Sequence, residues 1–423
     1  FFFKQKTAYE IRNCDWSSDV CSSDLKYPVL ILFDPHGDSR FAIEKYKSAA
    51  DKFEFILLST DAIKNGINSE MAAHVMQTIL ASVATQLPVN PTRVYVGGFS
   101  GGARYAAMLA MSGSGIQGLM VAGAGFPLDS WKELSPSVII AAANDGDMNL
   151  PEIFSLDQIK NAEQRGRLLT FRDAGIHEWP SADKMEEMLA IFTAYGLRDS
   201  IETDQSKLDS VLSTYHHLEE KQYCKASMIY QSLFYERAIK SLTGLSNVST
   251  YKSNYLKINS SSDFIAAKQS EVKLIAEEGQ IKNQYYAAMG TKDTSWWNLE
   301  MNELNSSIKN EKNILKQSQL MRIRNGLSLM CYMNLSKTMN ANSYQDAYYL
   351  AVLYRNIDPE NAESWFLSAV MEARTQNKSK AIYFLQKAID VGFKERQRVN
   401  QTPEFNSLLG EPSFQDLINR IPN

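Results

Sequence analysis

Residues 93–110 read RVYVGGFSGGARYAAMLA, and this stretch decides the fold of the first half of the chain. Val94, Tyr95 and Val96 favour a strand, a glycine-rich turn around Ser100 follows, and an alanine-rich run has the spacing of a helix. A strand, a tight glycine turn and a helix form the setting in which a G-x-S-x-G motif exposes a nucleophilic serine. A glycine-rich turn that only packs a helix on a strand is the alternative interpretation.

Strands and helices alternate on both sides of this turn, from Lys26 to about Tyr195. Besides the elbow strand, we expect strands at 27–33, 53–59, 116–124, 137–143 and 168–173, and the continuous apolar run at 27–33 is typical of a parallel strand buried on both faces. Besides the elbow helix, helical patterns lie at 41–51, 69–86, 155–164 and 182–195. This alternation predicts an α/β fold, a doubly wound and mostly parallel sheet with helices on both faces.

Candidate catalytic side chains follow three of these strands. Ser100 follows the elbow strand, Asp145 and Asp147 follow the strand at 137–143, and His177 follows the strand at 168–173. Open α/β sheets place their sites just beyond the carboxyl ends of strands. A serine hydroxyl needs an adjacent base to accept its proton, and the base needs a carboxylate that holds its tautomer. The residues therefore predict Ser100 as nucleophile, His177 as base and one of the two aspartates as acid.

Four motifs together resemble α/β-hydrolases of the esterase, depolymerase and dienelactone-hydrolase type. They are DPHG at 34–37, GGFSGGAR at 97–104, D-x-N at 147–149 and G-x-H-x-W-P at 175–180. The resemblance implies an acyl-enzyme mechanism with Asp147 as the acid, because of the D-x-N spacing, and Asp145 as the alternative. The first two strands usual in that family are not visible, and we expect that they belong to a native start that is missing here.

The resemblance also implies an oxyanion hole and a substrate pocket. The N–H of Gly101 and an N–H from the turn at Gly37 and Asp38 would hold the oxyanion. Candidate pocket residues are Phe99, Trp179 and His36; packing is the alternative role of Trp179, and orientation of the backbone that of His36. The segment 127–137 is too short for a lid, so we expect an open site that takes small-molecule or polymeric esters.

The bulk composition excludes several classes of protein. The 423 residues suffice for two or three domains, with 44% hydrophobic and 22% charged residues. A formal net charge of −4 gives no basic footprint for nucleic acid, and the longest apolar runs are too short to span a bilayer. Neither a CxxC pair nor a His/Cys metal pattern occurs among Cys14, Cys21, Cys224 and Cys331. The sequence therefore predicts no metal site and no cofactor.

Residues 1–24 fit neither a domain nor a signal peptide, because they lack an apolar core between a basic start and a small-residue cleavage site. They resemble the translated read-through of a sequencing adapter, so we expect a disordered segment that can be deleted without loss of stability. A real N-terminal tail is the alternative. Any native export signal would be missing with the true start, which leaves both an exported and a cytoplasmic bacterial protein open.

Long helical patterns replace the strands after about residue 196, at 205–219, 223–242, 262–288, 294–316 and 319–339. A period of 34 then relates Ala347, Ala351 and Tyr354 to Ala381, Leu385 and Ala388, and this resembles the tetratricopeptide repeat. We expect a hydrolase domain at 25–197, a helical region at 198–341 whose helices could be degenerate repeats, and tetratricopeptide-like repeats with a terminal unit at 342–423. Such helices would either bind a protein or peptide or stabilise the hydrolase or its oligomer.

The sequence as a whole favours a serine esterase with a helical repeat domain. A catalytically inactive hydrolase-fold scaffold that acts through its repeats is one alternative. A serine peptidase of the prolyl-oligopeptidase type is another, since the same three residues would serve it. The presence of every candidate catalytic residue and of the glycines around Ser100 favours the esterase.

Overall fold

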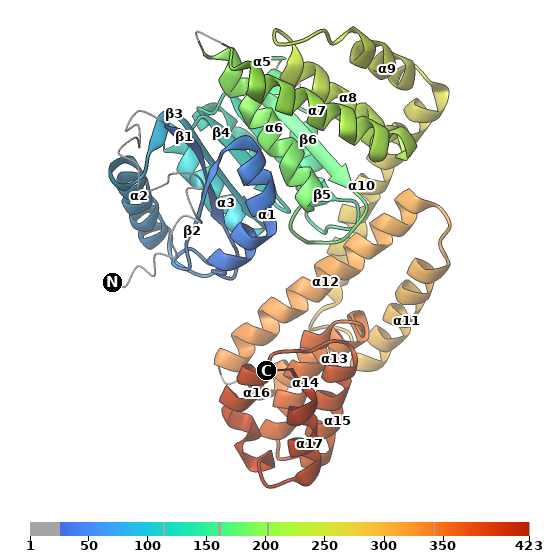
Figure 1. Cartoon of the computed structure of the whole chain (residues 1–423). Helices are drawn as coiled ribbons and strands as arrows, with labels where there is room; N and C mark the ends of the chain where they lie inside the picture. Colours follow the sequence, from blue (N-terminus) through green and yellow to red (C-terminus); the bar gives the residue numbers. More distant parts are fainter. Residues whose placement is uncertain (1–25, 113–114, 160–161, 201–202, 342, 423) are drawn as a thin grey trace. The chain divides into compact units, whose positions relative to one another are not determined.

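The computed structural model describes residues 26–112, 115–159, 162–200, 203–341 and 343–422, so the segment 1–24 lies outside the described residues. The chain divides into two compact units, one that ends at Ser270 and one that begins at Glu271 (Figure 1). Each unit has a hydrophobic core of its own.

The first unit contains a six-stranded sheet in the order β2-β1-β3-β4-β5-β6, and every pairing is parallel. The strands are β1 (Tyr27–Phe33), β2 (Ile56–Ser59), β3 (Val89–Phe99), β4 (Gly118–Ala122), β5 (Val138–Asn144) and β6 (Leu168–Asp173). The predicted fold class is thus confirmed. The strand expected at 53–59 begins only at Ile56, because α1 runs to Phe53 and Glu54 ends that helix in a left-handed conformation.

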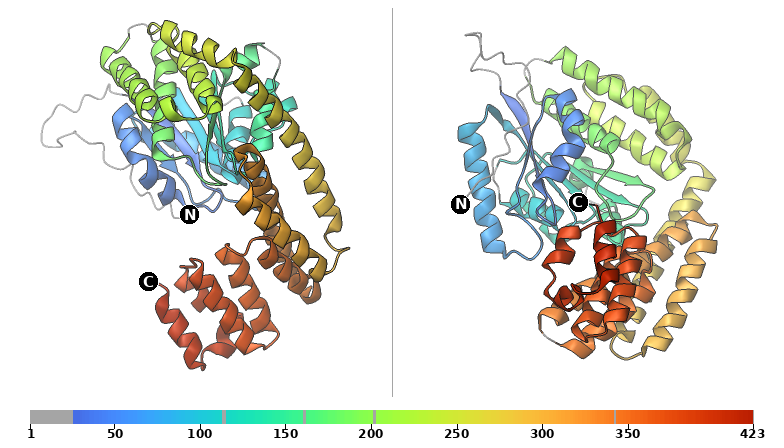
Figure 2. Two further views of the ribbon diagram at one scale, coloured as in Figure 1. Left: turned by 90° about the vertical axis from the view of Figure 1, so that its right-hand side faces the viewer. Right: turned by 60° about the horizontal axis from the view of Figure 1, so that its bottom comes forward.

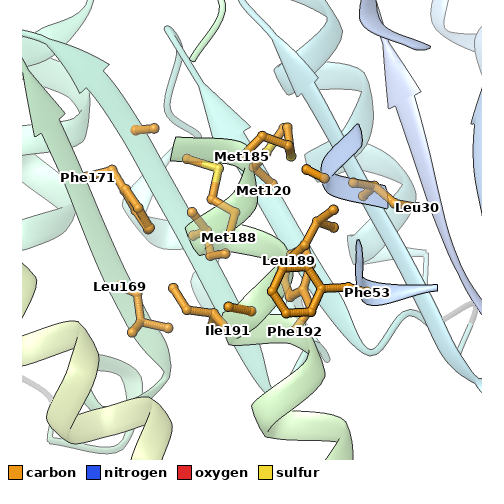
Figure 3. Close-up of a cluster of buried hydrophobic side chains, with 14 of the residues drawn as sticks. Leu30, Phe53, Met120, Leu169, Phe171, Met185, Met188, Leu189, Ile191 and Phe192 are labelled. Carbon is orange, nitrogen blue, oxygen red and sulfur yellow. The ribbon is translucent and has the colours of Figure 1, made fainter. Parts of the chain in front are cut away.

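Helices cover both faces of this sheet. They are α1 (Ser39–Phe53), α2 (Ser69–Gln86), α3 (Gly101–Met111), α4 (Leu150–Asp157), α5 (Ala162–Arg167) and α6 (Ala182–Arg198). On one face, Leu30, Met120 and Leu169 pack against residues of α6 and Phe53 of α1 (Figure 3). Helix α3 packs against β1, β3 and β4, and its buried alanines lie outside that cluster, which places α3 on the other face.

The predicted position of the helix at 155–164 is wrong. Helix α4 begins at Leu150, and the N–H of Leu150 donates to the carbonyl of Asp147. Pro151 lies in the first turn of α4, where its missing N–H costs nothing. The chain therefore enters a helix directly after the D-x-N turn, and α4 ends at Asp157.

The first unit continues beyond the sheet through α7 (Gln205–Lys221), α8 (Met228–Leu242) and α9 (Ser249–Asn259), seen from two further sides in Figure 2. Val211 and Phe234 belong to the same hydrophobic cluster as the sheet. Buried Arg237 of α8 pairs with Glu187 of α6 at 2.6 Å and donates to the carbonyl of Thr170 in β6 at 2.8 Å. By its packing, the first unit therefore ends at Ser270, whereas the composition of the sequence placed the end of the hydrolase domain at 197.

The second unit is helical throughout the part that the structure describes. It holds the end of α10 (Ser262–Ala288), then α11 (Thr294–Asn310), α12 (Ile314–Asn340), α13 (Tyr344–Ile357), α14 (Ala362–Arg374), α15 (Lys378–Asp390), α16 (Arg396–Gln401) and α17 (Pro412–Arg420). The predicted break at 316–319 lies instead at 311–313, where the Asn313 side chain caps α12. The alanines of the 34-residue period, Ala347, Ala351, Ala381 and Ala388, are all buried. That the repeats are of the tetratricopeptide type stays a prediction.

Candidate active site

Ser100 lies on a strained turn between β3 and α3. Its backbone has φ 52° and ψ −121°, a conformation that residues with a Cβ rarely adopt. A Cβ on Gly98 would come within 2.4 Å of the Gly102 carbonyl carbon, and a Cβ on Gly102 within 1.9 Å of the Phe33 oxygen. The glycines are therefore needed because the helix starts directly against the strands.

His177 connects Ser100 to Asp147. Its Nε2 lies 2.9 Å from Ser100 Oγ, and its Nδ1 lies 2.9 Å from Asp147 Oδ1. An imidazole whose Nδ1 proton faces the carboxylate leaves Nε2 free to accept the hydroxyl proton. Asp147 is buried and also accepts the N–H of Asn149 at 2.8 Å. Three predicted side chains, from the ends of β3, β5 and β6, thus form one hydrogen-bonded chain.

Asp145 faces a different set of partners. Its Oδ1 lies 3.0 Å from Nε and 2.5 Å from Nη2 of Arg172, and its Oδ2 accepts the hydroxyl of Tyr230 at 2.7 Å. Arg172 belongs to β6 and Tyr230 to α8, so Asp145 joins that helix to the edge of the sheet. Of the two candidate acids, the structure brings Asp147 to His177.

The expected oxyanion donors differ in their surroundings. Gly101 is the first residue of α3, where backbone N–H groups have no acceptor within the helix. In the DPHG turn the N–H of Gly37 donates to the Asp34 carbonyl at 3.2 Å, and that of Asp38 to Asp34 Oδ1 at 3.3 Å. Both expected N–H groups of the turn are therefore engaged inside it.

Asp34 organises that turn. It is buried, and its Oδ2 accepts the indole N–H of Trp179 at 3.0 Å. Burial by itself would raise its pKa, but hydrogen bonds from the His36 side chain, from Trp179 and from the backbone lower the pKa of Asp34 to about 2. The carboxylate is therefore ionised at neutral pH.

The three expected pocket residues lie in different environments. The His36 side chain is 84% exposed. Phe99 is buried and holds its ring 4.5 Å from that of His177, so it backs the imidazole. Trp179 lines a cavity of about 320 Å³ together with Gly123, Phe171, Met188, Lys45 and Lys184. Neither Ser100 nor His177 lines that cavity.

Sequence reasoning missed Asn65. A Cβ on Gly101 would lie only 1.7 Å from Asn65 Oδ1, so the carboxamide fills the space beside that glycine. The N–H of Asn65 donates to the Pro35 carbonyl at 2.8 Å. Its position in the loop after β2, another strand end, was the one signal that could have pointed to it.

Within the described ranges, no cluster of three or more His, Cys, Asp or Glu side chains is placed to hold a metal ion. Over the same residues, no helix combines the length and the apolar character needed to cross a bilayer.

Comparisons with known proteins add little. No family model matches the sequence. The curated proteins contain no match either. Among solved structures, an S-formylglutathione hydrolase from Agrobacterium tumefaciens aligns with a TM-score of 0.30 and 10% identity over 40% of this chain and 83% of that one. The esterase Est22 aligns with a TM-score of 0.26 and 13% identity over 46% of this chain and 74% of that one. Similarities this low say nothing about the function of this chain.

Proposed function

We propose that this chain is a serine hydrolase of the α/β-hydrolase type that cleaves carboxylic esters through an acyl-enzyme. The observation that supports the proposal is the pair of 2.9 Å contacts from His177, one to Ser100 Oγ and one to Asp147 Oδ1. A nucleophile, a base and an orienting carboxylate in this order are the parts that acyl transfer needs.

The reaction would proceed in two stages. Ser100 Oγ attacks the ester carbonyl while His177 Nε2 takes the hydroxyl proton, and buried Asp147 stabilises the imidazolium. The imidazolium then gives this proton to the departing alcohol, and the acyl group stays on Oγ. A water molecule repeats the sequence and releases the acid. Ser100 and His177 are both partly exposed, so a small ester can reach Oγ.

Hydrolysis of p-nitrophenyl acetate and butyrate tests the proposal. Ser100→Ala should lower kcat by a factor on the order of 10⁶ and abolish labelling by a fluorophosphonate, since losing the nucleophile leaves only binding and oxyanion stabilisation. Ser112→Ala, an exposed serine just after α3, serves as the control and should keep both. A folded chain that neither hydrolyses these esters nor labels at Ser100 would favour the inactive scaffold. Faster turnover of peptide p-nitroanilides than of esters would favour the peptidase.

We infer that the helical unit takes no part in the chemistry, because every group of the proposed mechanism lies between residues 34 and 177. Its two possible roles, binding a protein or peptide and stabilising an oligomer, stay predictions. Size-exclusion chromatography with light scattering separates them, since only the second requires an assembly of the pure protein.

A further inference from the structure

We propose that the side-chain amide of Asn65 is the second oxyanion donor of this site, an inference that rests on the proposed esterase function. In acyl transfer the carbonyl oxygen gains negative charge when Oγ attacks, and preorganised N–H groups must face it. The N–H of Gly101 supplies one donor. The second donor was expected from the turn at Gly37 and Asp38, but the N–H groups of that turn already donate to other acceptors.

Four consecutive N–H groups of that turn already have carboxylate or carbonyl acceptors. Those of His36 and Asp38 donate to Asp34 Oδ1, and that of Gly37 donates to the Asp34 carbonyl. The N–H of Ser39 donates to Asp61 Oδ1 at 3.0 Å. An oxyanion at this turn would have to compete with these acceptors for N–H groups that are already hydrogen-bonded.

Asp34 does not release these bonds readily. It is only 3% exposed and ionised at neutral pH, and hydrogen bonds to a buried carboxylate are stronger than those between neutral groups. Withdrawing an N–H would leave a buried charge with fewer partners, which is costly. The turn is therefore a scaffold held by Asp34, and its N–H groups are not free to serve the oxyanion.

Asn65 lies beside the donor that remains. Measured from the point where a Cβ on Gly101 would sit, its Oδ1 is at 1.7 Å and its Nδ2 at 3.3 Å. Two hydrogen bonds fix the loop that carries Asn65. The N–H of Asn65 donates to the Pro35 carbonyl, and the hydroxyl of Tyr105 on α3 donates to the Ile67 carbonyl at 3.2 Å. The residue is exposed, so substrate can contact it.

The chemistry of a carboxamide suits this role. Asn carries two N–H donors and no charge, and half a turn about χ2 exchanges the positions of oxygen and nitrogen. When Oγ attacks, the carbonyl electron pair moves to oxygen, which Gly101 N–H and Asn65 Nδ2–H would hold. When the pair returns, the bond to the alcohol breaks and the alcohol takes the proton from His177.

Steady-state kinetics of Asn65→Ala with p-nitrophenyl acetate provide the test. Removal of one oxyanion donor commonly lowers kcat by about 10²–10³, and we expect that fall with KM nearly unchanged. Inhibition by phenylboronic acid, whose tetrahedral adduct mimics the intermediate, should weaken by a similar factor. Asn65→Asp should be at least as slow, because a carboxylate accepts where a donor is needed. Lys64→Ala, its exposed neighbour, is the matched control and should keep kcat within about twofold.

Gly101→Ala provides an independent arm. Its Cβ would occupy the space of Asn65 Oδ1 and displace the carboxamide, so kcat should fall about as far as in Asn65→Ala. The double variant should be no slower than Gly101→Ala alone, because both changes remove the same donor.

The outcomes separate the two proposals. An active wild type with unchanged kcat in Asn65→Ala overturns the role of Asn65 and leaves the esterase function standing. A loss confined to KM, or losses that multiply in the double variant, overturns that role as well. A folded wild type without hydrolysis or Ser100 labelling removes both proposals together.

Discussion

Two aspartates that follow one strand have separate partners. Asp147 faces His177, whereas Asp145 is buried between Arg172 and Tyr230. The D-x-N spacing of the family that the sequence resembles favoured Asp147, and in the structure the N–H of Asn149 donates to Asp147 within that turn. The N–H groups of Gly37 and Asp38 both donate to Asp34, within the turn. The contacts that fix this turn from outside were not predictable, because Trp179, which donates to Asp34, and Asp61, which accepts the N–H of Ser39, lie far away in sequence.

The proposed acid role of Asp147 predicts unequal effects of two isosteric changes. Asp147→Asn should lower kcat by roughly 10⁴, because an amide cannot hold the required tautomer or stabilise the imidazolium. Asp145→Asn should leave kcat within a few-fold but destabilise the fold by about 3–5 kcal/mol, since Arg172 loses its buried partner. Ester kinetics together with urea unfolding of both variants measure this contrast, and equal or reversed losses in kcat would contradict the assignment.

The lowered pKa of Asp34 predicts a pH-dependent contribution to stability. Its ordinary value is 3.8 and its value in the fold is about 2, so the stabilisation is complete above about pH 4 and disappears as the pH falls through 2. At about 1.4 kcal/mol for each pKa unit, the contribution is roughly 2 kcal/mol.

Asp34→Asn should therefore lower the free energy of unfolding of the first unit by roughly 2 kcal/mol at pH 7 and by much less near pH 2. Urea unfolding at both pH values measures this difference. Asp51→Asn, an exposed change on α1, is the control that should keep the pH dependence of the wild type. A deficit of the same size at both pH values would show that the carboxylate charge is not its cause.

The elements differ in how well the sequence predicts them. Strands β1 and β5 are apolar over nearly their whole length, and their bounds follow from burial on both faces. Helix α9 was missed because it has no fully buried residue, so its sequence carries little apolar periodicity. Helix α4 was misplaced because a hydrogen-bonded turn, and not an apolar stripe, fixes its start.

The packing of α15 predicts the effect of a larger side chain at Ala381. This residue is fully buried in the core cluster of the second unit, on a helix that packs against α14, so Ala381→Leu should cost roughly 1–3 kcal/mol through overpacking. Ser379→Leu adds a leucine to an exposed position of the same helix and should change stability far less. Thermal melts compare the two, and equal melting temperatures would rule out a tight helix contact at Ala381.

At the scale of the whole molecule, the sheet depends on helices that follow it in sequence. The hydroxyl of Tyr223 donates to Glu187 at 3.0 Å and accepts from Arg237 at 2.9 Å, and Lys184 also donates to it. Arg237 and Glu187 are both almost fully buried. Composition placed these helices in a separate helical region that begins at residue 198, whereas packing groups them with the unit that holds Ser100.

The last prediction concerns where the chain can be cut. A chain that ends at Ser270 keeps the first hydrophobic cluster intact and should unfold cooperatively, with its ester hydrolysis retained.

A chain that ends at Leu197 loses Arg237 and Tyr230, which leaves Glu187 without its buried cation and Asp145 without a hydroxyl donor. Breaking one buried ion pair costs about 3–5 kcal/mol, a large part of a typical domain's roughly 5–15 kcal/mol. The shorter chain should therefore fail to fold, as circular dichroism and urea titration would show. Matching urea midpoints for the two chains would mean that the sheet is stable without α7 and α8, as composition alone suggested.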